Sequence, residues 1–117
     1  MAAFKTFKDI EAWQQARELT RDICGLRDQI RRASVSIMSN IAEGHERNGT
    51  GEFVQFLSMA KGSAGEVESH LCVAFDLGYL DKSAFDRPST TTARIGRLIG
   101  ALMQYLRKSG IKGGKYK

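Results

Sequence analysis

Basic side chains recur at helical spacing in two parts of the chain, and they are the residues best suited to a chemical task. A helix turns about 100° per residue, so residues three, four or seven positions apart share one side. Guanidinium and ammonium groups in such a row bind phosphates, and a protein that binds a nucleic-acid backbone without reading bases needs little else. The candidate nucleic-acid-binding residues are Arg94, Arg97, Arg107 and Lys108, with Arg17 and Arg21 as a secondary set.

Aromatic residues that could stack on bases are sparse near these cations. Tyr105 and Tyr116 are the only ones nearby, so base-specific recognition is not expected. A solvated helix face followed by a basic tail would produce the same pattern, and this alternative stays open.

The net charge of +5 is distributed unevenly along the 117 residues. Residues 1–32, 33–81 and 82–117 carry formal charges of +2, −5 and +8. The last segment has a single acid, Asp86, against nine lysines and arginines. Such a local positive field is typical of a polyanion-binding surface, although charge alone does not name the ligand.

Catalytic and metal-binding patterns have little support. A di-iron helical bundle needs Glu-x-x-His on two helices, and the chain has none. Glu66 and His70 are one turn apart and are interpreted as a surface pair, while His45 is interpreted as a loop residue. A Gly-rich phosphate loop and a Gly-x-Ser-x-Gly motif are also missing. We therefore expect no enzymatic activity, no metal and no cofactor.

Apolar spacing and end signals predict four helices that would position these side chains, at about residues 9–24, 28–46, 51–77 and 82–108. Thr50 and Asp81 are expected N-caps, Gly78 a C-terminal stop, and Pro88 a kink or restart of the last helix. Short loops favour an all-α, up-down-up-down antiparallel four-helix bundle. Residues 1–117 would form one domain, with 108–117 as a flexible basic tail.

Small residues recur at intervals of 4, 3, 4 and 3 on the third predicted helix, opposite its apolar face. Glycine in a helix interior costs about 1 kcal/mol relative to alanine, so two exposed glycines suggest the close approach of a second backbone. We expect contact with another subunit; neutral drift and contact with the chain's own first helix are the alternatives. A second apolar strip on the second helix supports an oligomer. The candidate interface comprises Ser58, Gly62, Gly65, Ser69 and Cys72, with Val35, Met38 and Ala42.

A polar row on the second predicted helix has two interpretations. It is either a solvated face or a hydrogen-bonded network buried between subunits, and it includes an i,i+4 ion pair between Glu43 and Arg47. The row consists of Arg32, Ser36, Ser39, Asn40, Glu43 and Arg47. The two cysteines, Cys24 and Cys72, are expected to be reduced. We predict a cytoplasmic protein, because neither a membrane span nor a signal peptide is evident.

The stretch from Gln29 to Gly44, QIRRASVSIMSNIAEG, strongly resembles the signature of the four-helix-bundle proteins encoded in intervening sequences of bacterial 23S rRNA genes. The segments DIEAWQ, EFVQFL and LGYL support the resemblance, which covers about residues 4–108. It implies a homopentamer and a relationship to the accessory variability protein of diversity-generating retroelements, a basic pentameric barrel that binds nucleic acid and a reverse transcriptase. The family has no established enzymatic activity.

The chain departs from the family pattern at three places. Met38 stands where the family usually has proline, and Pro88 stands where its fourth helix continues unbroken. About ten residues that usually precede the Gly-Leu pair are missing, because Cys24 runs directly into Gly25-Leu26. The first two helices are therefore joined by a short connection, fused into one long helix, or separated by a loop missing from this chain.

These observations favour a non-enzymatic, oligomeric adaptor that binds RNA or DNA through phosphates and contacts a nucleic-acid-processing protein. The alternative is a structural or protein-interaction oligomer without a nucleic-acid ligand.

Overall fold

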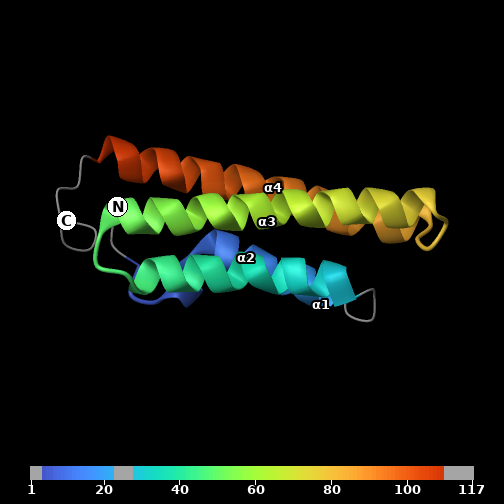
Figure 1. Ribbon diagram of the computed structural model, residues 1–117, viewed down its shortest axis with the longest axis horizontal. Helices are drawn as coiled ribbons and strands as arrows, with labels where there is room; N and C mark the ends of the chain where they lie inside the picture. Colours follow the sequence, from blue (N-terminus) through green and yellow to red (C-terminus); the bar gives the residue numbers. More distant parts are fainter. Residues whose placement is uncertain (1–3, 23–27, 110–117) are drawn as a thin grey trace.

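The computed structural model describes residues 4–22 and 28–109, and these residues form helices joined by short turns (Figure 1). The described side chains exclude those of residues 20–22. The elements are a 3-10 helix η1 (Phe7–Asp9) and the α-helices α1 (Glu11–Asp22), α2 (Asp28–Glu46), α3 (Thr50–Asp76) and α4 (Lys82–Lys108). Since the described ranges contain no strand, the all-α prediction is confirmed.

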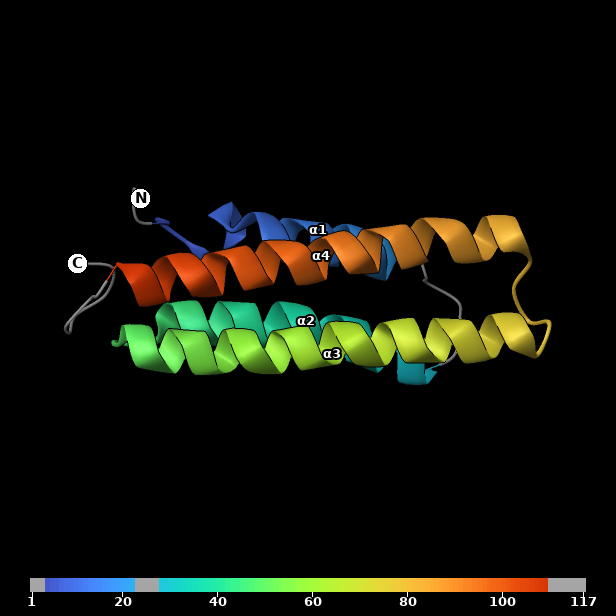
Figure 2. The ribbon, with the colours of Figure 1, turned by 90° about the horizontal axis from the view of Figure 1, so that it is seen from above.

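Each α-helix packs against two neighbours. The neighbouring pairs are α1 with α2, α2 with α3, α3 with α4, and α4 with α1, whereas α1 and α3, like α2 and α4, lie at diagonal corners. Successive helices run in opposite directions (Figures 1 and 2), which confirms the up-down-up-down bundle. Because α1 and α2 lie side by side, the first two helices are not one long helix. The connection itself, residues 23–27, lies outside the described residues.

The helices differ in length, and this shapes the molecule. Helices α3 and α4 have 27 residues each, against 12 in α1 and 19 in α2. Both views show the turn between α3 and α4 projecting beyond the other two helices (Figures 1 and 2). The molecule therefore measures 49 × 21 × 19 Å.

The core consists of the inward stripe of every helix, as the apolar spacing predicts. Its largest fully buried side chains are Phe53, Ile10, Leu19, Ile37, Ile41, Leu57, Leu71, Ile95, Ile99, Leu106 and Val67. Phe75 follows the apolar spacing of α3, which predicts a buried position, but it is 39% exposed. This residue lies in the projecting part of α3, where it packs only on Phe85 among the described aromatic rings, with centroids 4.9 Å apart.

The helix ends agree with the sequence at two of three predicted positions. The carboxylate of Asp81 accepts a hydrogen bond from the Ala84 amide at 2.8 Å, and Gly78 has a φ of 81°, which favours glycine. Thr50 is not the N-cap of α3, because the cap position is Gly49 and carries no side-chain hydrogen bond. Near the start of the chain, a capping box between Thr6 and Asp9 caps the N-terminal end of η1.

A kink or restart of the last helix was expected at Pro88, but the helix does not restart there. Helix α4 runs unbroken from Lys82 to Lys108, with Pro88 buried in its second turn. Proline removes one backbone hydrogen bond to the residue four positions earlier. The carbonyl of Pro88 accepts a hydrogen bond of 2.6 Å from the Thr92 hydroxyl, and the rest of the helix packs along α3 and α1. These contacts hold the helix together despite the lost bond.

His45 is a buried residue of α2, which overturns its interpretation as a loop residue. Its ring is 3% exposed and forms aromatic contacts with Phe4 and Phe53. Nε2 is 3.0 Å from the Phe4 carbonyl oxygen, and Nδ1 is 3.1 Å from a carboxylate oxygen of Glu46. The N-terminal segment folds back over the end of α2 and covers the ring, so His45 anchors this segment.

Candidate nucleic-acid interface

Helix α4 presents a row of cations along its outer surface. Helical geometry puts Arg94, Arg97 and Lys108 within an arc of about 60° and spreads them over about 21 Å of helix axis. All three are exposed. From residue 87 to the end of the chain there is no aspartate or glutamate, so no acid of this segment neutralises the row.

Arg94 and Arg107 lie at the two edges of this surface. A guanidinium nitrogen of Arg94 (Nη1) donates to Oε1 of Gln15 at 3.4 Å, which ties the row loosely to α1. Arg107 is exposed but lies about 80° around the helix from Arg97, toward α3. A single straight phosphate backbone along Arg94, Arg97 and Lys108 would therefore pass to one side of Arg107.

Arg17, the one cation of the secondary set with a described side chain, does not join the α4 row. Arg17 stacks over the Trp13 ring, 5.0 Å from its centroid, on the side of α1 nearer α2. Gln15, which contacts Arg94, lies on the opposite flank. The outer face between them carries the exposed acids Glu11 and Glu18. Arg21 belongs to α1, but its side chain lies outside the described residues.

The predicted small-residue interface on α3 is an open surface in this chain. Ser58, Gly62, Gly65, Ser69 and Cys72 are all exposed. A Cβ added at Gly62 or Gly65 would meet nothing within 4 Å, and α1 does not touch α3. Contact with the chain's own first helix therefore does not explain these glycines. Cys72 is a free thiol, whereas Cys24 lies outside the described residues.

The second apolar strip on α2 is divided. Val35 is 46% exposed, whereas Met38 and Ala42 are half-buried and pack against the core. Of these three residues, only Val35 offers a large exposed apolar surface to a neighbouring molecule.

The polar row on α2 is partly used within the chain. The hydroxyls of Ser36 and Ser63 lie 2.9 Å apart, linking α2 to α3, and Nδ2 of Asn40 donates to the Ser36 hydroxyl at 3.1 Å. The predicted ion pair joins Arg47 to Glu43 at 2.8 Å. Arg47 also lies over the ring of Phe56, 4.9 Å from its centroid. Arg32 and Ser39 remain exposed.

Metal-ligating side chains do not gather anywhere in residues 4–22 and 28–109. Glu66 is exposed, and the half-buried His70 lines a small cleft together with Ile30 and Leu77. Its Nδ1 has no hydrogen-bond partner within the described part. No helix of the described chain is long and apolar enough to cross a membrane.

Sequence reasoning missed two structural residues at the end of α2. At Gly44 the backbone approaches α3 so closely that an added Cβ would lie 2.7 Å from Cβ of Phe56. His45 is buried beside it. An isolated glycine within a helical pattern is a signal for such close approach.

Four antiparallel helices around one core define the protein as a four-helix bundle. The described residues contain no cluster of side chains that could hold a metal ion. The chain belongs to the family of 23S rRNA-intervening sequence proteins, whose model matches residues 8–101. A solved structure of a protein of unknown function from the S23 ribosomal protein family of Bacteroides thetaiotaomicron has a similar fold, with a TM-score of 0.77. It is 21% identical, and the match covers 83% of this chain and 98% of that one. No curated protein matches the chain.

Proposed function

We propose that this protein is a non-enzymatic, oligomeric adaptor that binds the phosphate backbone of RNA or DNA through the outer surface of α4. The observation that carries this proposal is the exposed row of Arg94, Arg97 and Lys108, in a segment that has no acid beyond Asp86. Three cations spaced over about 21 Å span several phosphates of a nucleic-acid strand. Backbone contacts of this kind position a protein without reading sequence.

Assembly would strengthen this surface. Five copies of a chain with a formal charge of +5 carry about +25, which raises the local concentration of a polyanion around weak individual contacts. The pentamer is the assembly that the family resemblance implies. A nucleic-acid-processing protein is the partner that such an adaptor would bring to the bound strand.

The second candidate function is a structural or protein-interaction oligomer with no nucleic-acid ligand. The open small-residue face of α3 favours it, because two exposed glycines lower helix stability unless another backbone covers them. Association through this face does not require a polyanion. The two candidate functions therefore differ in whether the protein binds a nucleic acid with an affinity that falls as salt rises.

The test is the binding of a labelled single strand and a labelled duplex by the wild type and by Arg94→Ala/Arg97→Ala over a salt series. We expect weaker binding for every sequence and a log–log salt slope lower by about two, one for each lost phosphate contact. The double variant Lys5→Ala/Lys8→Ala removes the same charge from η1 and its flank and should bind like the wild type. Equal affinities and slopes for the α4 variant would show that the α4 row is not the binding site.

A further inference from the structure

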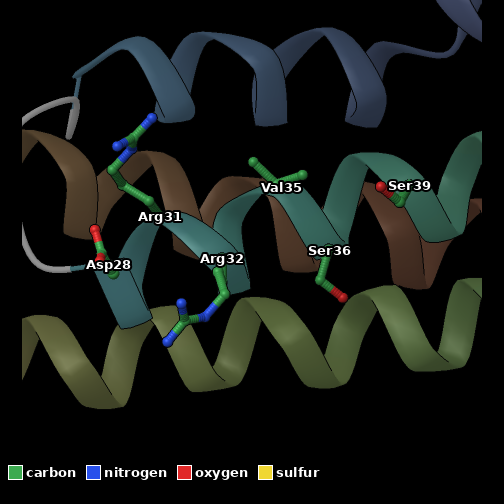
Figure 3. Close-up of a pocket in the computed structure, with 6 residues that line it drawn as sticks. All are labelled: Asp28, Arg31, Arg32, Val35, Ser36 and Ser39. Carbon is green, nitrogen blue, oxygen red and sulfur yellow. The ribbon is translucent and has the colours of Figure 1, made fainter.

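A hollow on the outer face of α2 contains two arginines that no described contact engages (Figure 3). Its lining residues are Asp28, Arg31, Arg32, Val35, Ser36 and Ser39. The side chain of Arg31 extends toward α1 and that of Arg32 toward α3, so the two guanidinium groups flank the helix (Figure 3). The hydroxyl groups of Ser36 and Ser39 follow one and two turns later along the same helix.

These arginines differ from Arg47, which directly follows α2. Arg47 is held by Glu43 at 2.8 Å and by the ring of Phe56. Arg31 and Arg32 are exposed, and within the described residues no hydrogen bond, ion pair or ring contact engages either of them. They lie about one turn from the N-terminal end of α2. The described contacts within the chain therefore do not account for these two cations.

The surroundings of the hollow suit an anion. Residues 29–42 contain no aspartate or glutamate, and Asp28 is the only carboxylate among the described lining residues. It lies one turn before Arg31 and Arg32, so two cations share a single acid at this end of the hollow. Small side chains leave room above the helix, and the exposed Ser39 hydroxyl is available as a donor. Arginine binds phosphate oxygens through paired N–H groups, and serine hydroxyls add single hydrogen bonds.

We propose that this hollow binds a chain of linked phosphates, in which Arg31, Arg32 and Ser39 each contact a different phosphate. The site is separate from the α4 row, because α2 and α4 occupy diagonal corners of the bundle. The linked phosphates belong to a nucleic-acid backbone or to a free polyphosphate, such as the phosphate chain of a nucleotide. Both sources present several phosphates in a row, so each guanidinium group can contact a separate one.

The experiment compares the full chain with Arg31→Gln/Arg32→Gln. One arm measures binding of inorganic tripolyphosphate by calorimetry, and the other measures binding of a labelled single-stranded RNA over a salt series. We expect the variant to lose about tenfold or more in tripolyphosphate affinity, since both charge-assisted hydrogen-bond donors of the hollow are removed. The control Lys5→Gln/Lys8→Gln removes equal charge at the other end of α2 and should leave both arms unchanged.

The two arms separate the sources of the phosphate. A lower RNA salt slope, by about two, assigns the site to a nucleic-acid backbone, whereas a change confined to tripolyphosphate assigns it to a free polyphosphate. Unchanged binding in both arms overturns the proposal. Light scattering of the variant checks that its mass and assembly match the wild type. The α4 row is tested with a different variant, Arg94→Ala/Arg97→Ala. A negative result for one site therefore leaves the proposal for the other site testable.

Discussion

Gly44 illustrates how a single residue sets the distance between two helices. An added Cβ would lie 2.7 Å from Cβ of Phe56 and 2.9 Å from a ring carbon of Phe53, both on α3. Such a contact is too short, so α2 and α3 would have to separate. The glycine therefore permits the close packing of this helix pair.

The substitution Gly44→Ala should lower the free energy of unfolding by about 1–3 kcal/mol, the usual cost of overpacking a core. The matched control is Gly96→Ala in α4, where an added Cβ meets nothing within 4 Å. That variant should be more stable than the wild type by about 0.5–1 kcal/mol, because alanine favours the helix. Urea denaturation measures both. A neutral or stabilised Gly44→Ala protein would contradict the close packing of α2 on α3.

At the level of helices, α4 depends on its first turn. It begins at Lys82, and the only side-chain cap described for its orphan amides is the carboxylate of Asp81, which accepts from Ala84. Pro88 removes a further backbone hydrogen bond close by. This end of the helix also lies in the part of the α3–α4 hairpin that projects beyond α1 and α2 (Figure 2). Local end signals therefore contribute more to helix stability at this end of α4 than in the middle of the bundle.

The substitution Asp81→Ala should lower the free energy of unfolding by about 1 kcal/mol, the typical value of an N-cap. Asp86→Ala is the comparison, because it removes an equal charge that takes part only in an exposed ion pair with Lys82. Its effect should stay within about 0.5 kcal/mol. Thermal unfolding of the two variants checks the difference, and equal losses would mean that charge rather than capping explains the effect.

For the whole molecule, the central question is how the open face of α3 is used. Gly65 lies on this face with nothing within 4 Å of an added Cβ. A leucine at this position is therefore compatible with the fold of one chain. It would, however, push away a second backbone that approaches at this point.

We expect the wild type to have the mass of a pentamer in light scattering at micromolar concentration, and Gly65→Leu to have a lower mass with unchanged helix content. The control Ser83→Leu adds a similar side chain at an exposed position in the first turn of α4 and should leave the mass unchanged. A monomeric wild type would refute the assembly. An intact assembly of Gly65→Leu would exclude this face from the interface.

Much of the candidate site was predictable from the sequence, because helical period is a local property. The spacing of Arg94, Arg97 and Lys108 already placed them on one side of a helix, and they are exposed together. The relation between helices was not predictable in this way. Arg17 stands on the flank of α1 away from Arg94. Arg31 and Arg32 have no described hydrogen bond or ion pair, an outcome that depends on the side chains that other helices place near them.

Apolar spacing, together with the end signals Asp81 and Gly78, was sufficient to predict the four helices and their order along the chain. Hydrophobic period and end signals act within a few residues. The burial of His45 depended on Phe4, which is 41 residues away, and the exposure of Phe75 depended on where α1 and α2 end. Such outcomes follow from which distant segments meet and how far each helix reaches. They required the tertiary structure, because burial is a property of the packed bundle rather than of any one segment.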